Sequence, residues 1–309
     1  MVPWIRKAAV FCLIALLFPY IITLARTGKI QGEKKNVIPD SGKTVILDRK
    51  GRETSMDAEE YLAGVVAMQM PVDYGREALR AQAVIARTYI YGKMNGQSKV
   101  KESELQMDFL EKKEMEKLWG SQAFADGYQL VEEAVNSTGR MVMMYDGKLI
   151  DPLFHRASTG RTRSGDELHP YLQSVECSRD VEADGFLTVT AWSREEFANK
   201  INQIPGKTAV SGNQVPESCQ IISRDESGYV TQMQIGTSTY TGEEVRQALG
   251  LSSAAYTFEP YEEGIRAVCQ GIGHGYGLSQ YGAKCKAEDG WTAERILSFF
   301  YKNIALVSE

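Results

Sequence analysis

Two helical patterns meet at a proline between residues 59 and 89, and this stretch constrains the fold more than any other. The first pattern places apolar residues at 62, 65 and 66, with Gln69 at the next position of the same helix face. This helix must end near Met70, because Pro71 pushes the preceding residue out of the helical region. We expect Asp57 and Glu60 to form the capping pair at its start.

A second helix is predicted from about Arg76 onward, with an apolar stripe through residues 79, 83, 86 and 90. Its many alanines would let another backbone approach closely. Two packed core helices would account for both patterns. Gln69, however, is a polar residue at a helix end that faces a loop, so it is also well placed for a functional site.

This stretch resembles the signature of the stage II sporulation protein D (SpoIID) family, whose members are lytic transglycosylases that act on peptidoglycan. The matching residues are Tyr61-Leu62, Gln69-Met70-Pro71 and the run EALRAQAVIARTY from Glu77 to Tyr89. One departure matters most: the position of the family's catalytic glutamate is occupied by Gln69.

Further blocks carry the same resemblance in the family's order, so that it covers roughly Asp57 to Tyr301. They contain Phe154-His155 with Ser158, Gly160 and Thr162, then Pro170-Tyr171-Leu172, then the helix that starts at Gly242, and finally GHGYGLSQYGA from Gly273 to Ala283.

The periodicity along the chain predicts an α+β protein of mixed helices and antiparallel strands. Strands are expected at residues 44–48, 141–145 and 229–235, and the Asp146-Gly147 turn should lead into a return strand from Leu149 to His155. Helices are expected after Ser193, from Thr241 to Leu249, and in the segment GWTAERILSFFY. We assign residues 44–309 to one domain, in which residues 92–120 form a helical insertion at the surface.

Residues 1–27 are predicted to be an N-terminal membrane anchor or signal, and residues 28–43 a linker. The uncharged run at 8–25 just reaches the length that spans a bilayer. A cleaved signal peptide is the alternative, but the cleavage site is weak and the apolar run is long, so we favour an uncleaved anchor. The family resemblance implies a single-pass protein of the cell membrane with its C-terminal domain extracytoplasmic.

The net charge of −5 argues against a nucleic-acid partner, which would call for a basic surface. Beyond the N-terminal run there are four cysteines, and either two disulfides or four buried free thiols are compatible with them. They are Cys177, Cys219, Cys269 and Cys285.

Glycine occupies every other position from Gly271 to Gly277, which strips one side of the backbone and permits close approach by a ligand or by another backbone. His274 and Tyr276 project from the other side. From the family match we predict a glycan-binding site at these residues and at Arg87, His155, Ser279, Gln280 and Tyr281, with Gln69 at the catalytic position.

Breaking a glycosidic bond usually requires a carboxylic acid that protonates the leaving oxygen, and the amide of Gln69 cannot supply that proton. Three interpretations stay open. A nearby carboxylate such as Glu60, Asp73 or Glu77 could substitute, or the site could bind glycan without cutting it and support a partner hydrolase. In the third, a metal held by His155, His169 and Cys177 would drive hydrolysis. No cofactor and no metal is predicted, because the region that carries metal ligands in some family members lacks cysteine and histidine here.

The resemblance implies a sporulation protein that acts during engulfment. It binds and remodels the glycan strands of peptidoglycan in the manner of a lytic transglycosylase. The implied partners are stage II sporulation protein P, a cell-wall hydrolase, and stage II sporulation protein M, a membrane protein.

Overall fold

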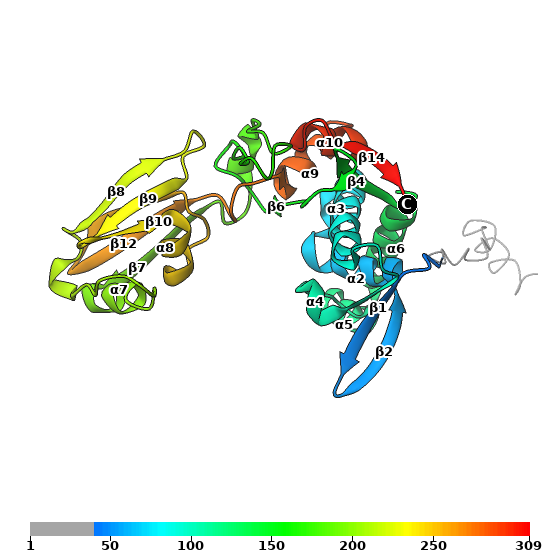
Figure 1. Cartoon of the computed structure of the whole chain (residues 1–309), viewed down its shortest axis with the longest axis horizontal. Coiled ribbons are helices and arrows are strands. Elements are labelled where there is room, and N and C mark those ends of the chain that lie inside the picture. Colours follow the sequence, from blue (N-terminus) through cyan, green and yellow to red (C-terminus); the bar gives the residue numbers. More distant parts are fainter. Residues whose placement is uncertain (1–39) are drawn as a thin grey trace, which may run out of the picture. The chain divides into compact units, whose positions relative to one another are not determined.

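The computed structural model describes residues 40–309, and Figure 1 shows them as an α+β arrangement, which confirms the predicted fold class. The anchor predicted at residues 1–27 lies outside the described residues, as does the linker up to residue 39. Within residues 40–309, no helix has both the length and the apolar character needed to cross a bilayer.

The first hydrophobic core combines the beginning and the end of the described chain. Its N-terminal elements are β1 (Thr44–Arg49), β2 (Arg52–Asp57), α2 (Ala58–Gln69), η1 (Val72–Tyr74), α3 (Arg76–Met94), β3 (Lys99–Lys101), α4 (Glu102–Leu105), α5 (Lys112–Trp119), α6 (Ser121–Asn136), β4 (Met141–Tyr145) and β5 (Lys148–Leu149). Its C-terminal elements are β13 (Leu278–Ser279), α9 (Gln280–Glu288), α10 (Ala293–Phe300) and β14 (Ala305–Ser308).

The helix pair predicted from the sequence forms the centre of this core. α2 and α3 pack against each other, and α6 packs against both. Asp57 is the N-cap of α2, as predicted, but its side chain accepts a hydrogen bond from the backbone N–H of Glu59 and not from that of Glu60. The helix ends at Gln69 because Met70, ahead of the proline, adopts an extended conformation.

The segment predicted as a surface insertion also contributes to this core. Within residues 92–120, Leu105 and Met115 are buried, and β3 pairs in parallel with β1. The ring of Phe109 stacks on Tyr61 with centroids 4.5 Å apart, because Gly64 leaves room for it: a Cβ at that position would collide with the Phe109 ring.

The second hydrophobic core lies in the middle of the sequence and is built from two three-stranded sheets with helices. The elements are β7 (Leu187–Ser193), α7 (Arg194–Ile201), η3 (Gly212–Gln214), β8 (Cys219–Arg224), β9 (Val230–Ile235), β10 (Ser238–Thr241), α8 (Gly242–Leu249), β11 (Tyr256–Tyr261) and β12 (Gly264–Gln270). The strand order is β10-β9-β8 in one sheet and β11-β12-β7 in the other, and every pairing is antiparallel. Ser193 and Thr241 cap α7 and α8, as predicted.

The prediction of one return strand from Leu149 to His155 is wrong. Of the predicted return strand, only Leu149 belongs to a strand that pairs with β4, namely β5 (Lys148–Leu149); β4 pairs on its other side with β14. Pro152 interrupts the segment because it has no N–H to donate to a ladder. β6 (Phe154–His155) pairs instead in parallel with β13, Leu278–Ser279, so the end of the glycine-rich run is tied to this segment. Between β6 and β7 the chain forms irregular loops and the short helix η2 (Ser178–Glu182).

Candidate functional site

Gln69 is held in a chain of three amide side chains. Its Oε1 accepts a hydrogen bond from Nε2 of Gln82, in α3, at 2.7 Å. Gln280, at the start of α9, donates from its Nε2 to the backbone oxygen of Gln69 at 2.8 Å and to Oε1 of Gln82 at 3.3 Å. Among residues 40–309 no acceptor pairs with the NH₂ group of Gln69, so this group remains available at the end of the row of three hydrogen-bonded amides.

A cavity of about 420 Å³ opens beside Gln69. This volume lies in the range of small-molecule sites. The lining combines amides, one carboxylate, aromatic rings and apolar side chains, a mixture that suits a sugar ring with polar edges and apolar faces. The lining residues are Met68, Gln69, Ile85, Ala86, Tyr89, Gln106, Met107, Asp108, Pro152 and Phe154.

Asp108 is the only carboxylate among these lining residues. The three carboxylates that the sequence suggested as substitutes lie elsewhere. Glu60 lines a separate pocket beside α5, Asp73 is exposed on η1, and Glu77 accepts hydrogen bonds from Arg80 and from the backbone N–H of Ala293. The carboxylate that shares the cavity with Gln69 therefore belongs to a residue that sequence reasoning did not single out.

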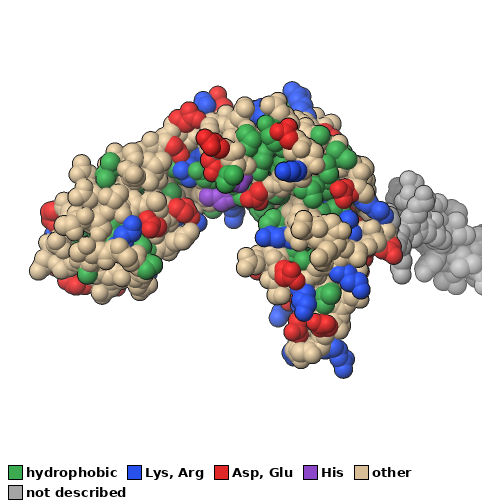
Figure 2. All heavy atoms as spheres, viewed as in Figure 1, with side chains coloured by type: hydrophobic (Ala, Val, Ile, Leu, Met, Phe, Trp, Pro, Cys, Tyr) green, Lys and Arg blue, Asp and Glu red, His purple; other side chains and the backbone are tan. Residues whose placement is uncertain are grey.

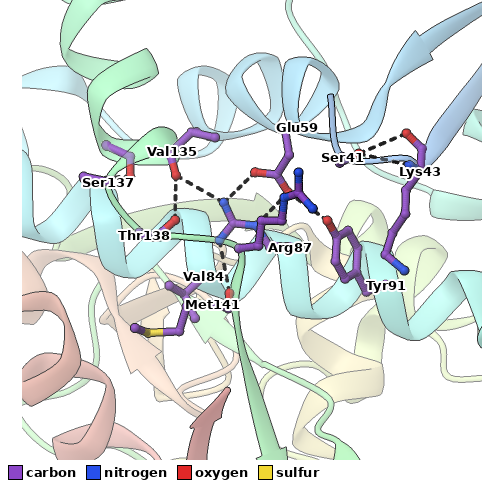
Figure 3. A network of polar contacts seen from close by, with 12 residues as sticks. Ser41, Lys43, Glu59, Val84, Arg87, Tyr91, Val135, Ser137, Thr138 and Met141 are labelled. Carbon is purple, nitrogen blue, oxygen red and sulfur yellow. Dashed lines mark hydrogen bonds and ion pairs between the residues drawn. The ribbon is translucent and has the colours of Figure 1, made fainter. Parts of the chain in front are cut away.

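Arg87, predicted to contact glycan, is instead a core residue with no exposed surface. Figure 3 shows its polar contacts. Its guanidinium forms two hydrogen bonds with the carboxylate of Glu59, Nε to Oε1 at 2.7 Å and Nη2 to Oε2 at 2.6 Å. It also donates to the backbone oxygens of Met141 and Val135, and Tyr91 donates to Glu59. A buried charge requires such partners, so Arg87 joins α2, α3 and the start of β4 and does not face the cavity.

His155 and His274 lie together, with ring centroids 5.9 Å apart. Nδ1 of His155 is 3.0 Å from the backbone oxygen of Tyr276, and the backbone N–H of Tyr276 donates to Nδ1 of His274. Burial, with His274 beside it, lowers the pKa of His155 to about 3, and burial also lowers the pKa of His274. Both rings are therefore neutral at pH 7. Neither lines the Gln69 cavity, although Phe154, next to His155, does.

The remaining predicted site residues have structural contacts as well. Ser279 is buried and caps α9 by accepting from the N–H of Gly282, while the guanidinium of Arg163 lies 4.4 Å from the ring centroid of Tyr276. Tyr281 meets Tyr74 edge to face at 6.2 Å. Gln280 is thus the one member of the glycine-rich motif that contacts Gln69.

The glycines at 271, 273, 275 and 277 all have positive φ, between 70° and 102°. A Cβ at these positions would meet this chain itself: the backbone at Ala157 and Ser158, His155, the ring of Tyr229, and the carbonyl of Leu153, respectively. The sequence suggested that these glycines allow close approach either by a ligand or by another part of the backbone. In the structure, other parts of this chain make the close approach.

The donors of the metal interpretation do not come together. His169 contacts Asp166 and Asp151, whereas His155 contacts His274. No group of three metal-ligating side chains occurs within residues 40–309. In the same part of the chain all four cysteines are free thiols, and burial raises the pKa of the Cys177 thiol.

Sequence reasoning missed Gln82 and Asp108. Gln82 had a signal: it is a polar residue on a helix of alanines, within the family motif. Asp108 had none, because residues 106–111 show no periodicity. Residues 106–108 line the cavity, and the adjacent Phe109 packs on Tyr61.

Comparison with known proteins identifies the family. A family model described as SpoIID, stage II sporulation protein, matches residues 50–145. The stage II sporulation protein D of Bacillus amyloliquefaciens is 32% identical over 259 residues, which cover 80% of this chain and 73% of that protein. The chain belongs to the stage II sporulation protein D family.

A second relative of the same name agrees with this assignment. The stage II sporulation protein D of Bacillus subtilis is 30% identical over 257 residues, covering 79% of this chain and 72% of its own length. A Bacillus subtilis protein named amidase enhancer is 25% identical over 298 residues, or 80% of this chain and 40% of its own. The protein is therefore a sporulation protein of the stage II D family in which Gln69 stands beside a cavity.

Proposed function

We propose that this protein binds glycan strands of peptidoglycan in the Gln69 cavity and supports a partner cell-wall hydrolase without cutting the strand itself. The main observation in support is the set of hydrogen bonds among the amide side chains of Gln69, Gln82 and Gln280. Because Gln82 occupies Oε1 of Gln69, the Gln69 NH₂ group is the part left to meet a ligand. An amide N–H can donate to the acetamido carbonyl or to a hydroxyl of an amino sugar.

Binding without cutting follows from the chemistry of the amide. A general acid contributes about 10²–10⁴-fold to such a reaction, and a glutamine has no proton to exchange at accessible pH. The amides of Gln82 and Gln280 fix Gln69 in place but do not change this limit. The relative named amidase enhancer supports a role in assisting another enzyme, since its name describes help to an amidase.

A second candidate, a lytic transglycosylase, is favoured by Asp108, whose side chain lines the same cavity. As an acid, Asp108 would protonate the glycosidic oxygen while the C1–O bond breaks. Its carboxylate would then take the proton of the muramic acid 6-hydroxyl as O6 bonds to C1, which yields a 1,6-anhydro end without added water. Tyr89 and Phe154 would supply apolar contacts to the sugar rings.

The setting of this activity is part of the proposal. We place the protein at the cell membrane as a single-pass protein with residues 44–309 outside, where peptidoglycan lies. The proposed partners are the hydrolase stage II sporulation protein P and the membrane protein stage II sporulation protein M. The N-terminal run of residues 8–25 and the family membership support this setting.

Binding is tested with the full-length protein in detergent and purified glycan strands that lack stem peptides. Gln69→Ala should weaken binding about tenfold, the effect expected for one well-placed hydrogen bond in a site. Gln220→Ala is the matched control, because this glutamine is exposed on β8, away from the cavity. Equal binding by both variants would place the glycan elsewhere.

Cutting is tested by mass spectrometry for 1,6-anhydro-muramyl ends on the same strands. The proposal expects none from the wild-type protein. Ends that appear with the wild type and with Asp126→Asn, but not with Asp108→Asn, would instead establish the transglycosylase and its acid. Asp126 is a suitable control because it is exposed on α6 and does not line the cavity.

A further inference from the structure

A second cleft, of about 540 Å³, lies in the part of the chain that holds the second core. The loop before η2, the β8–β9 turn and the strands β11 and β12 form its walls. Its lining residues are Thr159, Arg161, Arg224, Glu226, Ser227, Gly228, Ala255, Tyr256, Thr257, Val268 and Gln270. None of them belongs to the Gln69 cavity.

Two arginines, Arg161 and Arg224, line this cleft. The guanidinium of Arg224 is fixed by hydrogen bonds from Nη1 to the oxygen of Gly228 at 2.8 Å and from Nη2 to the oxygen of Tyr256 at 2.7 Å. A guanidinium has five N–H donors, so three remain for a ligand. Arg161 is exposed, and among residues 40–309 no carboxylate lies within salt-bridge distance of it.

Two acidic side chains at the β8–β9 turn have partners of their own. Glu226, the one carboxylate in the lining, accepts a hydrogen bond from Oγ of Ser164 at 2.8 Å. Asp225, next to it in the turn, forms a salt bridge with Arg163 at 2.6 Å. With two arginines against one glutamate, the lining has an excess of positive charge on a chain whose formal net charge is −5. Figure 2 shows basic and acidic side chains mixed over the visible face.

The loop that carries Arg161 and the turn that follows Arg224 at the end of β8 are tied to each other. Oγ1 of Thr159 donates to the backbone oxygen of Ser227 at 2.7 Å, and Oγ of Ser227 donates to the backbone oxygen of Thr162 at 2.8 Å. These bonds hold the loop against the turn, and the guanidinium of Arg224 is held in place before any ligand arrives. A preorganised site loses less entropy on binding than a mobile one.

We propose that the Arg161–Arg224 cleft binds a carboxylate of peptidoglycan. A guanidinium matches a carboxylate because two parallel N–H donors meet its two oxygens. The source of that carboxylate rests on the proposed function: N-acetylmuramic acid carries a lactyl carboxyl group, and stem peptides end in another. A strand seated in the Gln69 cavity and a carboxylate held in this cleft are separate contacts, made by different residues.

The test is a ligand-observed NMR titration of the full-length protein in detergent with three probes: N-acetylmuramic acid, N-acetylglucosamine and the dipeptide D-Ala-D-Ala. N-acetylglucosamine has the sugar without the carboxylate, and the dipeptide has the carboxylate without the sugar. Arg161→Gln should weaken binding of an acidic probe about tenfold. The control is Arg52→Gln, because Arg52 is exposed on β2 and does not line the cleft.

Arg224→Lys adds a second measurement, because lysine keeps the charge but loses the planar fork and should also weaken binding. Tighter, Arg161-dependent binding of either acid supports the proposal and identifies which carboxylate is read. Equal binding of N-acetylmuramic acid and N-acetylglucosamine with no binding of the dipeptide, or no effect of Arg161→Gln, overturns it. Gln69→Ala separates the two proposals. If it abolishes binding of glycan strands but leaves binding of the three probes unchanged, glycan binding in the Gln69 cavity is supported, whatever the result for the Arg161–Arg224 cleft.

Discussion

Gln280 donates a hydrogen bond from its side chain to the backbone oxygen of Gln69 at 2.8 Å, although 211 positions separate the two residues. The same Nε2 reaches Gln82, so the last family motif is joined to the first through one amide group. This contact fixes the end of α2, and with it Gln69, against the start of α9. The position is thus held by the fold even though its side chain is not an acid.

Gln69→Glu should restore an acid to an otherwise intact site. Nε2 of Gln82 already donates to Oε1 of Gln69, and a carboxylate oxygen can accept the same bond. We expect the variant to fold with a stability close to wild type and to produce anhydro-muramyl ends that the parent does not, since a general acid contributes about 10²–10⁴-fold to such a reaction. Mass spectrometry of digested glycan strands measures this gain.

The double variant Gln69→Glu/Asp108→Asn controls for the neighbouring carboxylate. If cutting appears in Gln69→Glu and survives the second change, the introduced acid acts alone. A folded Gln69→Glu protein that binds glycan strands but never cuts them would show that more than the acid is missing from the cavity.

The helix pair and its proline break could be predicted because their determinants are local. Residue spacing sets the buried face of α2, Pro71 sets its end, and Ser193 and Thr241 act within one turn of the helices that they cap. The pairing of β6 with β13 could not be predicted, because it joins segments more than a hundred residues apart without a turn between them.

The candidate site divides in the same way. Gln69 was found from a motif, and its position at a helix end is a consequence of local sequence. The cavity beside it is not, because residues 106–108, Pro152 and Phe154 also line it. Arg87 was misread because a charged residue among alanines can face either a ligand or a buried partner. Only the packing of α2 on α3 brings Glu59 to it. Asp108 depends on Phe109 filling the space over Gly64, which no pattern in the sequence reports.

Arg87→Met should destabilise the protein strongly. It would leave the carboxylate of Glu59 buried without its cation, and breaking a buried pair from one side costs about 3–5 kcal/mol. The double variant Glu59→Leu/Arg87→Met should recover part of that loss, because it removes both charges. Urea unfolding measures both effects, with Arg52→Met as an exposed control. A loss below about 1 kcal/mol for Arg87→Met would contradict the structural role assigned to this arginine.

Gly277→Ala and Gly290→Ala form a matched pair that separates backbone strain from collision. The two glycines have similar φ, 70° and 79°, so each alanine pays about 1 kcal/mol for a left-handed conformation. At Gly277 a Cβ would also strike the carbonyl oxygen of Leu153, whereas at Gly290 nothing lies within 4 Å. We expect Gly277→Ala to lower the free energy of unfolding by at least about 2 kcal/mol more than its partner. Equal losses of unfolding free energy in the two variants would mean that the backbone at Gly277 does not lie close to the carbonyl of Leu153.

Stability should fall as the pH drops below the ordinary pKa of histidine, because His155 is kept neutral in the fold. Burial, with His274 adjacent, lowers its pKa from 6.5 to about 3. Between these two values the unfolded chain binds a proton that the folded chain does not. The contribution of His155 is therefore complete above pH 6.5 and is lost by up to about 1.4 kcal/mol per pH unit as the pH falls towards 3. Urea unfolding at pH 7.5 and pH 5.5 measures the loss.

The variant His155→Asn is the control, because its amide can still donate to the oxygen of Tyr276 but does not titrate. The difference in the free energy of unfolding between the two pH values should therefore shrink by about 1 kcal/mol. An unchanged difference in this variant would show that another group carries the acid sensitivity.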